Sequence, residues 1–190
     1  METGGQIGEG QRAQLELAAA LHRPLARAAQ LGRSNAWGYA IFGVLTLLLA
    51  ALGPDPLALA VGAVVTGVGV AQLRAARRLR AADPRAPRAM ARNELLLMGA
   101  IGLYALLKLT LLAETGEALR SSGVDATGLG LDIEELARSL NTLVYSGVLA
   151  VTLLYQGGLA LYFLRRRATL ERYLAEAPEW ARTTVESLGE

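Results

Sequence analysis

Four apolar stretches of about twenty residues dominate this sequence and restrict the folds open to it. They occupy residues 35–52, 57–73, 95–113 and 142–164. Each is close to the ~20 residues that a helix needs to cross ~30 Å of hydrocarbon. Helices buried in a soluble bundle keep a polar face with a period of 3.6 residues, whereas these stretches are apolar nearly all round. The sequence therefore predicts an all-α, integral membrane four-helix bundle.

The composition agrees with this prediction and excludes several kinds of chemistry. Hydrophobic residues make up 53% of the chain but aromatic residues only 5%, whereas a soluble core of this size normally uses more phenylalanine and tyrosine. There is no cysteine and only one histidine, His22, which excludes disulfides, thiol catalysis and a multi-histidine metal site. The apolar stretches contain no paired carboxylates and no nucleophile motif. We therefore expect a non-enzymatic protein without a cofactor.

The distribution of arginine predicts how the bundle is oriented. Segments 1–34, 74–92 and 165–190 carry sixteen of the 18 arginines, whereas segment 114–141 has six acids against two arginines. Positive residues concentrate on the cytoplasmic side of membrane proteins. We expect both termini to be cytoplasmic, the membrane to be a bacterial cytoplasmic (inner) membrane, and the first apolar stretch not to be a cleaved signal peptide.

The segments between and beside the apolar stretches have distinct predicted roles. The second helix should run on to about Ala82 and the third should begin near Arg88, with Pro87 in its first turn. Gly32 should end the helix that precedes the first apolar stretch. Pro178 should open a short helix near the end of the chain. The predicted segments are a disordered tail (1–10), an amphipathic cytoplasmic helix (11–32), the membrane domain (35–164) with its basic loop (74–92) and acidic outer stub (114–141), and an interfacial tail (165–190).

A capping box marks the start of the fourth long helix. Asp132 can cap the helix while Glu135 reaches back from the third helical position, and Leu131 and Leu136 fit the accompanying hydrophobic staple. The helix should therefore begin near Ile133, outside the apolar stretch, and run to Arg167.

Lys108, the only lysine, stands within the third apolar stretch. At 1.5 Å per residue it lies ~20 Å from the inner edge and ~10 Å from the outer edge of the hydrocarbon. Three interpretations remain open: its side chain extends outward to water, it bonds to a hydroxyl on the fourth helix, or it lines a path for an anion or a lipid head group. In the first two cases we expect its ammonium near Tyr145, Ser146 or the outer acids.

Other polar side chains fall on the third and fourth apolar stretches and should face protein, since lipid cannot satisfy them. They form either a narrow polar seam or ordinary hydrogen bonds between helices. The candidate intramembrane polar site comprises Lys108, Tyr104, Tyr145, Ser146, Thr152, Tyr155 and Gln156.

Small residues recur at helical spacing in the apolar stretches, which is typical of helices that approach closely in lipid. These residues allow close packing either between helices of one chain or between copies of the chain in a homo-oligomer. The candidate packing residues are Gly43, Gly62, Ala63, Thr66, Gly67, Ala71, Gly147, Gly157 and Gly158.

The arginine-rich segments also suggest partners. Arg74–Arg92 and Arg165–Arg167 should contact anionic lipid head groups of the bilayer. The arginine loop has no interleaved aromatic residues, so we expect no nucleic-acid partner. The predicted function is that of an assembly or interaction subunit, alone or in a larger membrane complex. The alternative is a small oligomeric channel or transporter with a polar path near Lys108 and the fourth helix.

Overall fold

The computed structural model describes residues 8–53, 55–110 and 133–188. These residues form five helices and no strand, which confirms the all-α prediction for the described part of the chain. The helices are α1 (Glu9–Leu52), α2 (Pro56–Arg80), α3 (Ala86–Thr110), α5 (Ile133–Glu176) and α6 (Glu179–Ser187).

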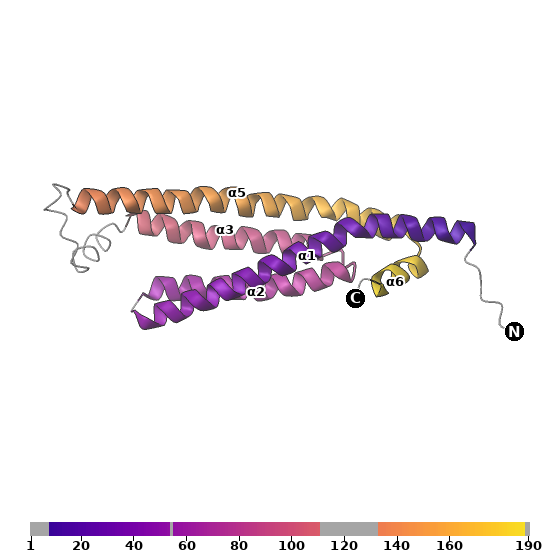
Figure 1. Ribbon diagram of the computed structural model, residues 1–190, viewed down its shortest axis with the longest axis horizontal. Helices are drawn as coiled ribbons and strands as arrows, with labels where there is room; N and C mark the ends of the chain where they lie inside the picture. Colours follow the sequence, from indigo (N-terminus) through magenta and orange to yellow (C-terminus); the bar gives the residue numbers. More distant parts are fainter. Residues whose placement is uncertain (1–7, 54, 111–132, 189–190) are drawn as a thin grey trace.

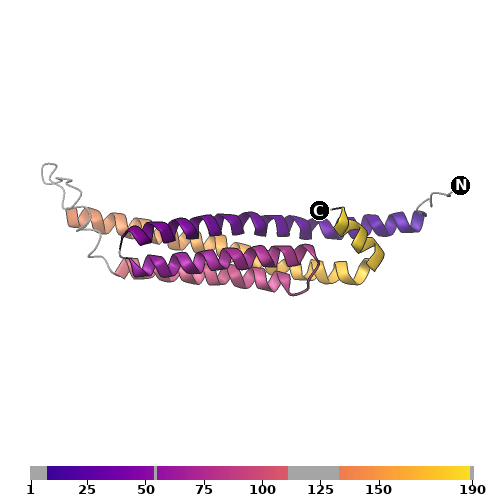
Figure 2. The same ribbon diagram turned by 90° about the horizontal axis from the view of Figure 1, so that it is seen from below.

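The four long helices run lengthwise in an elongated bundle made of two antiparallel hairpins, α1 with α2 and α3 with α5 (Figures 1 and 2). The first residues of α1, the α2–α3 connection and α6 lie at one end, here called the arginine end because Arg77, Arg80 and Arg85 are there. The α1–α2 connection and the first residues of α5 lie at the other end, here called the Asp55 end. All four long helices are long and apolar enough to cross a membrane.

Helix α1 runs without interruption through Pro24 and Gly32, so the predicted helix end at Gly32 is wrong. Gly32 is buried, and a methyl group added to it would collide with the side chain of Met90. The glycine therefore leaves room for the end of the Met90 side chain and does not end the helix. The amphipathic segment and the first apolar stretch are two halves of one helix.

Helix α5 begins at Ile133, as predicted, but continues past Arg167 to Glu176. Ion pairs one turn apart support the extension, from Arg167 to Glu171 at 2.7 Å and from Arg172 to Glu176 at 3.0 Å. Residues 131 and 132 of the predicted capping box lie outside the described residues. As predicted, Pro178 directly precedes the short helix α6.

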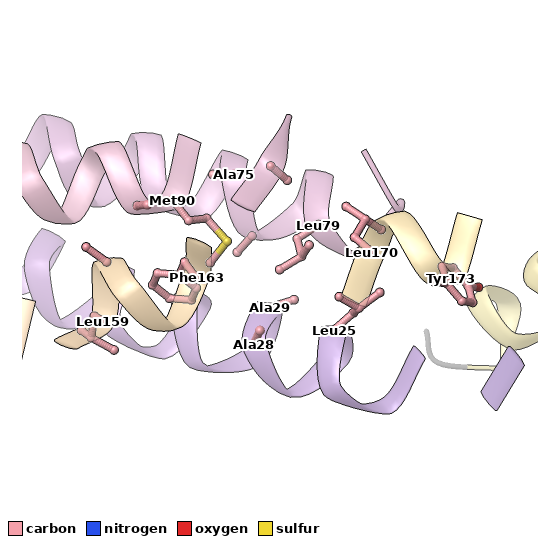
Figure 3. Packing of buried hydrophobic residues seen from close by; sticks show 14 of the residues in the cluster. Leu25, Ala28, Ala29, Ala75, Leu79, Met90, Leu159, Phe163, Leu170 and Tyr173 are labelled. Carbon is pink, nitrogen blue, oxygen red and sulfur yellow. The ribbon is translucent and has the colours of Figure 1, made fainter. Parts of the chain in front are cut away.

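The largest hydrophobic core lies at the arginine end, beyond most of the apolar stretches (Figure 3). All five helices contribute to it, and Met90 of α3 and Phe163 of α5 point toward one another at its centre. Leu25, Met90, Phe163, Leu170 and Tyr173 are all at most 1% exposed. Burial of this kind is driven by the exclusion of water, which suits a part of the bundle that lies outside hydrocarbon.

The apolar stretches themselves are packed differently. Large side chains such as Ile41, Leu103 and Leu154 point outward and are 59–79% exposed. Between α1 and α2, glycines lie inside instead, where Gly43 of α1 faces Gly62 of α2. Water exclusion gives helices little reason to associate in lipid, so close backbone contact between small residues replaces it.

Candidate functional site

Five polar side chains from all four long helices meet inside the bundle. Tyr39 comes from α1, Gln72 from α2, Asn93 and Glu94 from α3, and Gln156 from α5. Their exposed fractions are 0% for Gln72 and Glu94, 3% for Asn93 and 6% for Gln156, and Tyr39 is half-buried. We call this group the polar centre.

Hydrogen bonds join the members of the polar centre into a chain. The Gln72 amide donates to Glu94 Oε1 at 2.9 Å, and the Asn93 amide donates to Gln72 Oε1 at 3.0 Å. The Tyr39 hydroxyl lies 2.9 Å from Glu94 Oε2 and 3.2 Å from Gln156 Oε1. A phenol has one hydrogen to donate, and the shorter distance favours Glu94 as its acceptor. The carboxyl group of Glu94 thus ties α1, α2 and α3 together.

Neither Glu94 nor Asn93 belongs to the candidate site that the sequence predicted. The third apolar stretch begins at Leu95, so Glu94 fell among the charged flanking residues. In the structure α3 begins nine residues before Leu95, at Ala86, and Glu94 is fully buried inside it. One feature of the sequence could have pointed to Glu94. Gln72 is a polar residue near the arginine-rich end of the second apolar stretch, and Glu94 lies at the corresponding end of the third.

Lys108 lies at the Asp55 end of the bundle. Its Nζ is 3.4 Å from Asp55 Oδ2, and the two side chains are 17% and 38% exposed. Nζ also lies 5.9 Å from the centre of the Tyr104 ring, within reach of a cation–π interaction. The Asn141 amide donates to the backbone carbonyl of Lys108 at 3.1 Å. Asp55, in the short connection between the first two helices, was not an expected partner.

Asp55 has a second role as the N-cap of α2. Its Oδ1 accepts the backbone N–H of Ala58 at 2.9 Å, and Pro56 occupies the first helical position. The Ala58 N–H, and after it the charge of Lys108, hold the pKa of Asp55 below its usual value, although burial opposes them. The carboxylate therefore stays charged, so that one side chain caps a helix and pairs with the lysine.

The residues of the predicted polar site do not lie together, because some are at the Asp55 end and others are at or near the polar centre. Tyr104 and Tyr145 lie with Lys108 at the Asp55 end, their rings 6.1 Å apart and edge to face. Gln156 belongs to the polar centre, and Thr152, one turn away on α5, is buried. The Tyr155 hydroxyl donates to Asn35 Oδ1 at 3.2 Å. Ser146 is exposed.

An apolar cleft of about 600 Å³ lies among the four long helices, in the half of the bundle toward the Asp55 end. Helices α1 and α2 contribute to one side of it and α3 and α5 to the other. The lining is formed by Phe42, Thr46, Ala58, Val61, Ile101, Tyr104, Tyr145, Gly147, Val148, Val151 and Thr152. Pockets for small molecules are typically of this size and mostly apolar, with a few polar groups.

The candidate packing residues also divide into two sets. Gly43, Gly62 and Thr66 lie at the contact of α1 with α2, joined by Gly69, which the sequence analysis did not include among the candidates. A methyl group added to Gly67, Gly147, Gly157 or Gly158 would meet no atom within 4 Å. Ala63 is exposed and Ala71 is half-buried.

A second polar group joins α6 to the bundle at the arginine end. The buried Tyr173 hydroxyl donates to Glu186 Oε1 at 3.2 Å, and the His22 ring lies 5.5 Å from the Tyr173 ring. Burial raises the pKa of Tyr173 to about 12. Burial also lowers the pKa of His22, partly opposed by the charge of Glu186. His22 is therefore neutral at pH 7.

Among the described residues no group of three or more His, Asp or Glu side chains is arranged to hold a metal ion. The chain matches no protein-family model, no curated protein and no solved structure.

Proposed function

We propose that this chain is a non-enzymatic multi-pass protein of a bacterial cytoplasmic membrane and that it works as an assembly or interaction subunit. One observation carries the proposal: the bundle interior has a polar centre that is closed on itself and, beside it, a cleft that is apolar. Such an interior is suited to holding apolar segments of neighbouring molecules and is poorly suited to passing ions.

The polar centre argues against a conducting route. Its buried amides and carboxyl group hydrogen-bond mainly to one another, so they do not offer a row of free groups along which an ion could exchange its water. The cleft next to it is lined by side chains such as Phe42, Val148 and Val151. An ion entering this space would lose its hydration without replacement, which costs far more than the available binding energy.

The cleft gives the interaction proposal a direct test. A side chain added at Gly147 projects into open space, so Gly147→Leu should fill part of the cleft without disturbing the fold. Gly158→Leu is the matched control, because Gly158 also has open space around it but does not line the cleft. Site-specific photo-crosslinking from Val151 in native membranes should yield a defined product in the wild type and in the control, and lose it in Gly147→Leu. Equal crosslinking in both variants would contradict the proposal.

A second candidate, a small oligomeric transporter, is favoured by the position of Lys108 and Tyr104 beside the same cleft. Flux of anions through proteoliposomes separates the two functions. For an interaction subunit, protein-containing and empty vesicles should leak equally, and Lys108→Met should change neither flux nor assembly. Flux that depends on the protein and disappears in Lys108→Met, while the protein still assembles, would establish the transporter instead.

A further inference from the structure

Three arginines from two helices converge at the arginine end of the α1–α2 hairpin. Arg33 of α1 and Arg77 and Arg80 of α2 line two neighbouring hollows of about 560 and 120 Å³. The larger hollow extends toward α6 and is completed by His22, Gln30 and Glu186, together with Ala26 and Ala81. Trp37 contributes to the smaller one.

None of these three arginines forms an ion pair with a carboxylate of the described residues. Arg167 and Arg172, by contrast, each pair with a glutamate one turn on. The positions one turn from Arg33 are Ala29 and Trp37, and those one turn from Arg77 are Leu73 and Ala81.

Two acids lie nearby, Glu186 in the lining of the larger hollow and Asp83 in the α2–α3 connection, and each accepts a hydrogen bond from another residue. Glu186 accepts the Tyr173 hydroxyl, and Asp83 accepts the backbone N–H of Arg85 at 2.8 Å. The three guanidinium groups line the same two hollows and repel each other. A bound anion would therefore stabilise this cluster of positive charges.

The chemistry of the hollow matches a phosphate group. Guanidinium groups bind phosphate oxygens through paired hydrogen bonds, a geometry that lysine cannot reproduce. His22 lines the larger hollow, and its Nε2 is buried without a hydrogen-bond partner among the described residues. That nitrogen can accept or, when protonated, donate a hydrogen bond to a ligand.

The position of the larger hollow along the bundle also supports a phosphate ligand. Arg33 comes just before the first apolar stretch begins at residue 35, and Arg77 follows the end of the second at residue 73. Trp37, two residues into the apolar stretch, is 54% exposed, and tryptophan is enriched at the boundary between hydrocarbon and water. In a bilayer the hollow would therefore lie at the level of the lipid phosphates.

We propose that Arg33, Arg77 and Arg80 form a binding site for the phosphate group of an anionic ligand in the hollow between α1, α2 and α6. The phosphate is carried either by a lipid of the surrounding leaflet or by a soluble phosphate ester. Such a site differs from the general attraction of a basic loop to the membrane. General attraction depends on the total number of positive charges, whereas this site depends on three particular arginines.

Native mass spectrometry of the full chain in detergent can test this requirement. Phosphatidylglycerol, glycerol phosphate and inorganic phosphate are titrated separately into the wild type, into the pocket variant R33Q/R77Q/R80Q and into the control variant R74Q/R78Q/R85Q. Both variants remove three charges from the same end, but the control residues line neither hollow.

The pocket variant should bind phosphatidylglycerol at least about tenfold more weakly than the wild type, because a hydrogen bond to a charged group is worth about tenfold or more in affinity. The control variant should stay within about twofold of the wild type, because its three arginines line neither hollow. If glycerol phosphate or inorganic phosphate binds the wild type and not the pocket variant, the ligand is soluble. If only the lipid does so, the ligand comes from the bilayer.

Equal loss of affinity in the pocket and control variants, or loss in neither, would overturn the proposal. A lysine variant, R33K/R77K/R80K, keeps the charge and therefore guards against a failure of the glutamine variant to fold. It should bind several-fold more weakly than the wild type because an ammonium group lacks the paired donors. Unchanged affinity in the lysine variant would also count against the site.

Discussion

Glu94 has an unusual position for a charged residue, because it is 0% exposed and lies within one of the four helices that can cross a membrane. A buried carboxyl group is costly unless its oxygens are hydrogen-bonded. Here both oxygens accept, one from Gln72 and one from Tyr39. The three side chains come from three helices. Both oxygens of the carboxyl group can therefore be hydrogen-bonded only when the two hairpins are aligned lengthwise in one particular way.

Removing the carboxyl group should therefore destabilise the bundle. Glu94→Ala leaves the buried Gln72 amide without its acceptor, at about 1–3 kcal/mol, whereas the Tyr39 hydroxyl can still donate to Gln156 Oε1, 3.2 Å away. Glu94→Gln keeps one acceptor oxygen and should cost less. The free energy of unfolding, measured by titration with a denaturing detergent, checks both variants. Glu171→Ala removes an exposed carboxylate that pairs with Arg167 and should cost under about 1 kcal/mol. An equal loss for Glu94→Ala and Glu171→Ala would contradict this account.

The residues of the site were only partly predictable from the sequence. Gln156 and Thr152 were identified because polar groups inside apolar stretches must face protein. Glu94 was missed because a hydropathy boundary was drawn at the first charged residue, although the helix extends well beyond it. The Asp55 partner of Lys108 was missed because it lies on another hairpin, and a helical period says nothing about which neighbouring helix a residue meets.

His22 gives the arginine end a dependence on pH. Burial holds its pKa below the ordinary value of about 6.5. As the pH falls below about 6.5, the unfolded chain therefore takes up a proton before the folded chain does, and stability decreases. Between pH 7.5 and 5.5 the melting temperature of the wild type should fall, and His22→Phe, which keeps an aromatic ring against Tyr173, should flatten that slope. Identical slopes in the two proteins would show that another group is responsible.

At the scale of helices, the sequence predicted which segments are helical better than where they end. The four apolar stretches identified the four long helices because length and hydropathy are enough for that purpose. The ends were wrong at Gly32 and Arg167. Gly32 is buried beside the end of the Met90 side chain, which no local rule for glycine as a helix end contains. Past Arg167, ion pairs one turn apart support the continued helix.

Close approach of α1 to α2 depends on Gly43. A methyl group there would lie 2.6 Å from the backbone nitrogen of Thr66 and 3.0 Å from the carbonyl oxygen of Gly62, so a helix backbone would have to move. Gly43→Ala should destabilise the protein by about 1–3 kcal/mol, as overpacked positions do. Gly67→Ala, on α2 but in open space, should be neutral or stabilising by up to about 1 kcal/mol. Unfolding titrations of the two variants check the contrast, and a harmless Gly43→Ala would contradict the packing argument.

At the scale of the whole molecule, two kinds of packing are joined end to end. The arginine end has the larger core of buried side chains. The half toward the Asp55 end has only a small buried cluster of Val65, Val68 and Leu97, small residues between α1 and α2, and many large apolar side chains exposed. The polar centre lies between the two. This division is the one expected if only the second half is surrounded by lipid, because hydrophobic burial orders helices in water and small-residue contact orders them in hydrocarbon.

The orientation of the bundle in the membrane can be measured directly. Arg85 lies in the α2–α3 connection at the arginine end, and Gly53 lies in the α1–α2 connection at the opposite end. Because positive residues are retained on the cytoplasmic side, the arginine end should face the cytoplasm. The chain has no cysteine, so Arg85→Cys, Ser187→Cys and Gly53→Cys each introduce a unique thiol for a membrane-impermeant maleimide. In right-side-out vesicles only Gly53→Cys should be labelled, and in inside-out vesicles only the other two. Labelling of Gly53→Cys and Arg85→Cys from the same side would rule out a membrane-spanning α2, and the reverse pattern would mean that the arginines do not set the orientation of this protein.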